Sequence, residues 1–156
     1  LEKFGDYLQD IEDSVDWNLL NAEKFKHYLC YPEHSLKPNE NYFKGLLLYK
    51  KKQYRKSIDW FNKTIAITPN YAPAYHQRAM AKYALHNFDG LWNDIDTAIE
   101  LNPNFAEAYF DRGIIKQMLE SSYPPQKGCS DICKAYELGY PIQESGVATN
   151  CDCMQK

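Results

Sequence analysis

The sequence repeats one unit at a fixed interval. The stretch TPNYAPAYHQRA, residues 68–79, returns as NPNFAEAYFDRG, residues 102–113, with six of its twelve positions identical. A further copy, residues 39–70, precedes them and ends in Thr-Pro-Asn, as the next copy ends in Asn-Pro-Asn. A unit of this size cannot bury an apolar face alone, so in-phase copies predict that neighbouring units stack to form one continuous core.

The spacing of apolar residues predicts two helices in each copy. Such residues recur at helical intervals, as in the sets Tyr42, Leu46, Tyr49 and Ile58, Phe61, Ile65. Short breaks at residues 52–53 and 86–87 divide the copies into two helical stretches each. Pro69 and Pro103 then close a copy, because proline cannot continue the helix that precedes it.

With these features the chain resembles tetratricopeptide repeat (TPR) proteins, whose 34-residue unit is a helix–turn–helix. A small residue fills the slot where the two helices cross, and aromatic residues recur in the first helix and at the start of the second. These residues are Gly45, Ala79 and Gly113 in the slot, Tyr75 and Tyr109 in the first helix, and Tyr54 and Phe88 at the start of the second. The resemblance implies an all-α fold, a right-handed α-solenoid of stacked antiparallel helix pairs.

The resemblance also implies the domain organisation. We expect three units, at residues 38–71, 72–105 and 106–139. In the third unit the turn between the helices, residues 121–127, is about three residues longer than its counterparts and contains Pro124-Pro125. Residues 1–37 carry helical periodicity outside the repeat, and we expect a helical hairpin that is a degenerate leading unit or a cap. Residues 140–156 are expected to form a capping helix and a cysteine-containing tail.

Two arginines occupy a place that is more often apolar in TPR proteins. Arg78 and Arg112 are accompanied by Asp94 and Asp131 at the matching place of the second helix, and the first unit has neither partner. Since arginine and aspartate are present or absent together, we expect a partly buried ion pair that joins the two helices of a unit. A role for these residues in holding a ligand is the alternative.

In TPR proteins the first helices line a concave groove that takes an extended peptide or a helix. The resemblance implies that the exposed groove residues here are Tyr42, Phe43, Leu46, Tyr49, His76, Gln77, Met80, Tyr83, Phe110, Asp111, Ile114 and Gln117. An aromatic and apolar set of this kind is typical of a surface that binds a protein or peptide. Glu107 and Asp111 would repel a carboxylate, which disfavours binding of the C-terminal carboxylate of chaperones.

Five cysteines are present, and four of them lie close together in the sequence: Cys129, Cys133, Cys151 and Cys153. Cys129 and Cys133 are one helical turn apart, too far for a mutual disulfide. A bridge from that helix to Cys151 or Cys153 would hold the tail as a cap. Free or buried thiols and a metal site are the alternatives, although the spacing is not a common zinc spacing. Cys30 is expected to be a packed thiol.

Composition and motifs narrow the function. The formal net charge is −3 and basic residues form no long stripe, which disfavours nucleic acid as a partner. No apolar run is long enough to span a bilayer. The sequence contains no phosphate-binding loop, nucleophile elbow or metalloprotease motif, so we expect no enzyme and no cofactor. Because the chain begins with Leu1, its localisation is not predicted.

We therefore predict a non-catalytic scaffold for protein–protein interaction, with an unidentified protein or peptide as its ligand. One alternative is a structural module of a larger protein, whose groove is filled by the chain's own termini or by a second copy in a homodimer. The other is a metal- or redox-linked module built on the C-terminal cysteines.

Overall fold

The computed structural model describes residues 40–119, 126–142 and 151. The chain divides between Lys37 and Pro38 into two units, and all described residues lie in the second. The hairpin expected at residues 1–37 therefore lies outside the described residues. Most of the expected capping helix, residues 143–150, and Cys153 lie outside them as well.

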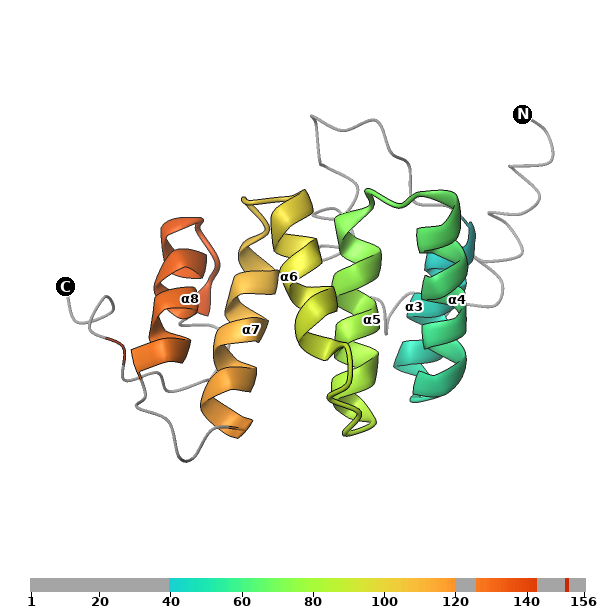
Figure 1. Ribbon diagram of the computed structural model, residues 1–156, viewed down its shortest axis with the longest axis horizontal. Coiled ribbons are helices and arrows are strands. Elements are labelled where there is room, and N and C mark those ends of the chain that lie inside the picture. The colour runs from blue at the N-terminus through green and yellow to red at the C-terminus, as the bar shows by residue number, and fades with distance from the viewer. Residues whose placement is uncertain (1–39, 120–125, 143–150, 152–156) are drawn as a thin grey trace. The chain divides into compact units, whose positions relative to one another are not determined.

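The described residues form α-helices and no strand. The helices are α3 (Glu40–Lys50), α4 (Tyr54–Ile67), α5 (Ala72–Ala84), α6 (Leu91–Leu101), α7 (Ala106–Leu119) and α8 (Gln126–Glu137). They follow one another in chain order (Figure 1), and each packs against the next. None of these six is long and apolar enough to cross a lipid bilayer. The all-α helical repeat predicted from the recurring unit is confirmed.

The turns inside the first two helix pairs share one backbone conformation. Lys52 and His86, which occupy equivalent places in successive copies, both have a left-handed backbone, with φ of 57° and 53°. Backbone hydrogen bonds close both turns in the pattern of the Schellman motif, in which one left-handed residue ends a helix. The repeat is therefore a repeat of turn geometry as well as of helix periodicity.

Two of the predicted helix boundaries are wrong. Phe88 does not begin the second helix of its pair: α6 begins at Leu91, and Phe88 lies in the preceding loop with 38% of its surface exposed. The reason is Gly90, whose left-handed φ of 70° cannot be part of a right-handed helix. In the third pair, α8 begins at Gln126, so the last two residues of the turn predicted at 121–127 are helical.

Small residues allow the two helices of a pair to cross closely. A Cβ atom on Gly113 would lie 2.7 Å from the carbonyl oxygen of Gly128 on the facing helix. A Cβ atom on Gly45 would lie 2.5 Å from the ring of Phe61. Ala79 occupies the same place in α5 and is fully buried. The slot thus sets the distance between the helices, because nothing larger fits without displacing backbone or an aromatic ring.

The core runs through the stack of helices instead of lying within single pairs. One cluster of buried residues joins α5, α6 and α7, and it consists of Ala72, Ala98, Ile99, Phe105 and Ala108. Tyr75 and Tyr109, the recurring tyrosines of the first helices, pack against this cluster. The hydroxyl of Tyr75 also donates a hydrogen bond to the carbonyl of Pro69, 2.8 Å away, and so ties α5 to the loop that precedes it.

Candidate functional site

Four of the twelve side chains expected to be exposed in a groove are buried. They are Tyr42, His76, Gln77 and Phe110, with exposed fractions of 1%, 1%, 8% and 6%. The ring of Tyr42 packs edge-on against Tyr71 at 5.1 Å between ring centroids, so Tyr42 is part of the aromatic core between two helix pairs. These four side chains are therefore not available as the direct contacts of a partner.

The other eight expected residues are half-buried, and we call them the first-helix face. They are Phe43, Leu46 and Tyr49 on α3, Met80 and Tyr83 on α5, and Asp111, Ile114 and Gln117 on α7. Met80 and Tyr83 pack against a buried cluster that includes Ala79 and Ile115. The hydroxyl of Tyr83 also lies 3.4 Å from the sulfur of Met118 on α7, which has 68% of its surface exposed.

A histidine–aspartate pair joins the first helices of successive pairs. His76 Nε2 on α5 lies 2.8 Å from Asp111 Oδ2 on α7, and the imidazole ring packs against Phe105 at 5.0 Å. Burial lowers the pKa of His76, but the hydrogen bond and charge of Asp111, with the charge of Glu107, outweigh it and raise the pKa. Nδ1 of the same ring is buried and has no hydrogen-bond partner among the described residues.

Two tyrosines from distant parts of the chain lie in the electrostatic field of Asp111. Burial raises the pKa of Tyr49 on α3, and the charges of Tyr54 and Asp111 raise it further. Burial also raises the pKa of Tyr140, which follows α8, to about 12, with contributions from Asp111 and Glu107. Asp111 is therefore hydrogen-bonded to α5, and its charge acts on one tyrosine of α3 and on one that follows α8.

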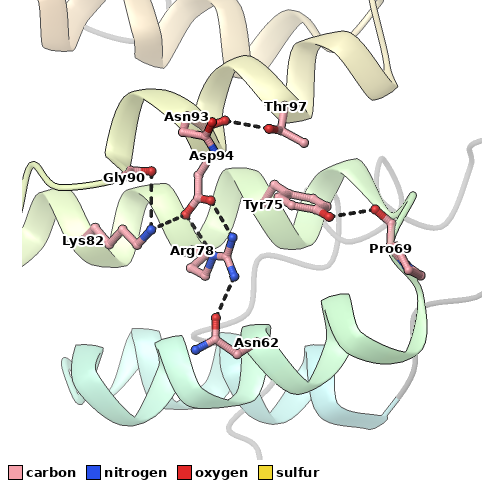
Figure 2. A network of polar contacts seen from close by, with 9 residues as sticks. All are labelled: Asn62, Pro69, Tyr75, Arg78, Lys82, Gly90, Asn93, Asp94 and Thr97. Carbon is pink, nitrogen blue, oxygen red and sulfur yellow. Dashed lines mark hydrogen bonds and ion pairs between the residues drawn. The ribbon is translucent and has the colours of Figure 1, made fainter.

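A polar network ties the second helix pair together (Figure 2). Arg78 on α5 donates from Nε and Nη2 to the carboxylate of Asp94 on α6, at 2.8 and 2.5 Å. Lys82 donates to the same carboxylate at 2.7 Å and to the carbonyl of Gly90 at 3.3 Å. Arg78 Nη1 also reaches Asn62 on α4, at 2.6 Å. Asp94 is buried but accepts three hydrogen bonds, so its charge is compensated.

The same network recurs in the third pair. Arg112 donates to Asp131 at 2.8 and 2.6 Å, and Lys116 donates to it at 2.8 Å. Arg112 Nη1 reaches back to Asp96 on α6 at 2.6 Å. The structure thus contains the two ion pairs expected from the sequence. It also shows two contacts that were not predicted: a lysine that binds the same carboxylate, and a contact with the preceding pair. Both recur in successive copies, and the recurrence of the lysine is visible in the sequence.

In the first helix pair a different contact takes this place. Lys44 stands where the later pairs have arginine, and Trp60 stands where they have aspartate. The Lys44 ammonium group lies 5.0 Å from the centroid of the Trp60 ring, within the range of a cation–π interaction. Lys63 lies over the same ring at 3.9 Å. A cation on the first helix therefore meets the second helix in all three pairs.

A disulfide bond joins α8 to the C-terminal tail. Cys129 and Cys151 are bonded across 22 residues, and Cys133 is also disulfide-bonded. The Nε2 atom of Gln117 on the first-helix face lies 3.6 and 3.7 Å from the sulfurs of Cys129 and Cys151. Within the part of the chain that is described, no three histidine, cysteine, aspartate or glutamate residues are grouped so that they could hold a metal ion. Cys151 belongs to a buried cluster with Phe110, Ile132, Ala135 and Ile142.

Paired antiparallel helices, close crossings at small residues and a recurring sequence unit define a TPR-like fold. No family model matches the chain, and no curated protein matches it in sequence. Among solved structures the chain is similar to MamA 41-end from Desulfovibrio magneticus RS-1, at 21% identity and a TM-score of 0.58 over 72% of this chain. It is similar to a MamA RS-1 ArsTM double mutant, at 22% identity and a TM-score of 0.58 over 70% of this chain.

The Sgt2 TPR domain from Aspergillus fumigatus is similar at 21% identity and a TM-score of 0.52, over 78% of this chain and 77% of that one. The matches span only 61% of each MamA chain, less than two thirds of its length. At these identities the likenesses establish the fold, and the TPR-like architecture predicted from the repeat is confirmed.

Proposed function

We propose that this protein is a non-catalytic binding module that holds a peptide or helical segment of a partner protein on the first-helix face. The observation that carries the proposal is the hydrogen bond between His76 on α5 and Asp111 on α7, because it fixes the first helices of two successive pairs relative to each other. Stacked helix pairs commonly present extended binding surfaces of this kind. The tyrosines and Met80 of this face are residue types favoured in protein interfaces.

The histidine–aspartate pair supports a binding role over a catalytic one. An imidazole acting as general base must reach a substrate proton directly or through one water. His76 has 1% of its surface exposed, and its Nε2 is engaged with Asp111. Its position suits a contact that holds two first helices in register better than a contact with substrate.

Affinity capture from an extract of the source organism tests this function. We expect a partner to be retained by the parent protein and lost, by about tenfold or more, from a Tyr49→Ala/Tyr83→Ala variant, since aromatic anchors dominate interface energies. Tyr136→Ala is the matched control, because Tyr136 is 46% exposed but lies on α8, outside the first-helix face. A partner retained equally by all three proteins would place the binding site elsewhere.

A further inference from the structure

Asp111 has one carboxylate oxygen that is hydrogen-bonded within the protein and one that is not. Its Oδ2 atom is hydrogen-bonded to His76 Nε2, whereas no described residue donates a hydrogen bond to Oδ1. The side chain is 27% exposed, so a ligand can reach it. A half-buried carboxylate with an unused acceptor oxygen is suited to a charge-assisted hydrogen bond.

A second carboxylate lies on the same face as Asp111. Glu107 lies one helical turn earlier on α7, on the same face, and both carboxylates act on Tyr140. The basic residues of α7 do not offset this charge, because Arg112 and Lys116 are bound to Asp131. Among the described residues, His76 is the one group that forms an ion pair with Asp111.

The hydrogen bonding of this centre is incomplete. The ring of His76 is 1% exposed and points at Asp111, yet its Nδ1 atom has no partner among the described residues. Because Nδ1 is buried, it is not a contact for a ligand, and the acceptor left open in this centre is Asp111 Oδ1. Aromatic rings complete the surroundings, since Tyr140 stacks on Phe110 at 4.6 Å between centroids.

We infer that the partner segment carries an arginine or lysine side chain that binds Asp111 beside Glu107. A cation is attracted by both carboxylates. An anion in the same place is repelled, and an apolar group desolvates Asp111 without replacing its hydrogen bonds. This inference rests on the proposed function and names the chemistry of the partner.

Selection from a random dodecapeptide library displayed on phage tests the inference without knowledge of the partner. The bait is the full chain with its disulfides intact. We expect the enriched peptides to share an arginine or lysine at one fixed place. A synthetic copy of an enriched peptide should bind about tenfold more weakly to Asp111→Asn, and about tenfold more weakly to the parent when its basic residue is replaced by glutamine.

Two further variants keep the result interpretable. Glu107→Gln lowers the charge of the centre without touching the His76 contact, and we expect it to weaken binding several-fold even if Asp111→Asn fails to fold. Asp89→Asn makes the same change in charge at an exposed residue between α5 and α6, and it should bind as the parent does.

Each outcome of the selection bears on a different statement. Enriched peptides that share no basic residue, or that bind the parent and both centre variants equally, overturn the cation inference and leave the proposed function standing. Enriched peptides that bind a Tyr49→Ala/Tyr83→Ala variant as tightly as the parent contradict the proposed face. A selection that enriches no peptide overturns the proposed function and the inference with it.

Discussion

Arg112 binds Asp131 across 19 residues in the same two-pronged manner in which Arg78 binds Asp94 across 16 residues. The difference of three residues matches the extra length predicted for the turn before α8. The added residues therefore leave the pairing of the two helices unchanged. The register between facing helices, and not the distance along the chain, is what this contact preserves.

Removal of an arginine from this network should destabilise the protein strongly. Arg78→Met leaves the buried carboxylate of Asp94 with Lys82 as its remaining ionic partner. Breaking a buried pair leaves an uncompensated charge, so we expect a loss of about 3 kcal/mol in the free energy of unfolding. Chemical denaturation monitored by circular dichroism measures this loss.

The control for this variant is an exposed ion pair. Lys134→Met breaks a contact with Glu137 in which the side chains are 46% and 66% exposed, and we expect a change of less than about 0.5 kcal/mol. Replacing both partners, in Arg78→Met/Asp94→Leu, should restore part of the stability lost in Arg78→Met. Identical denaturation midpoints for Arg78→Met and the parent would show that the pair contributes nothing.

The close helix crossing of the third pair predicts a cost for one added methyl group. In Gly113→Ala the new Cβ atom would meet the backbone carbonyl of Gly128, which cannot rotate away, so we expect a loss of about 1–3 kcal/mol. Gly45→Ala should cost less, since the atoms that it meets belong to the Phe61 side chain. Thermal unfolding of both variants is compared with that of Ser130→Ala, whose position on α8 lies outside the crossing. A larger loss of stability for Gly45→Ala than for Gly113→Ala would contradict this ranking.

Reduction of the disulfides should loosen the C-terminal part of the array. Cys129–Cys151 closes a segment of 22 residues, and its loss is expected to lower the free energy of unfolding by about 3 kcal/mol. Thermal unfolding with and without reductant measures the effect, and Cys129→Ser/Cys151→Ser should reproduce most of it. Because Cys133 is also bonded, and Cys129 and Cys151 are bonded to each other, four cysteines are in disulfides and at most one of the five thiols should react in the unfolded, unreduced protein. Five reactive thiols would contradict this prediction.

The histidine–aspartate pair predicts a dependence of stability on pH. The pKa of His76 is raised in the folded protein above its ordinary value of 6.5. The pair's contribution is therefore fully present below about pH 6.5 and is lost as the pH rises through the raised pKa. Denaturation at a series of pH values should show the parent losing stability over this window, and His76→Gln should not show that loss.

A direct titration separates this effect from those of other groups. Proton NMR of the His76 ring in the parent should give a pKa above 6.5, and in Asp111→Asn the pKa should fall, because burial then acts without the opposing carboxylate. A pKa for His76 at or below 6.5 in the parent protein would contradict the assigned role of Asp111.

The helix pairs were predictable from the sequence because their signals are local. Pro69 and Pro103 mark where helices end, and each weak signal gains weight because it recurs in successive copies. The ion pairs followed from the joint presence of arginine and aspartate. The aromatic pattern at Phe88 does not predict the start of α6, because the left-handed backbone of Gly90 delays the helix until Leu91.

The candidate site was less predictable, because burial depends on contacts that lie far apart in the sequence. Helical spacing places His76 and Phe110 on the same side of their helices as the first-helix face, but it does not reveal which residues cover them. The partner of His76 belongs to the next helix pair, and Phe110 stacks on Tyr140, which follows α8. Spacing likewise left open whether Cys129 pairs with Cys151 or Cys153, since these two cysteines are only two positions apart in the sequence.

The guanidinium groups of Arg78 and Arg112 affect how the stack of helix pairs unfolds. Each one bonds to the second helix of the preceding pair, Arg78 to Asn62 and Arg112 to Asp96, as well as to its own. A terminal pair therefore cannot fray without also breaking a contact of its neighbour. Such nearest-neighbour coupling makes melting along the stack cooperative.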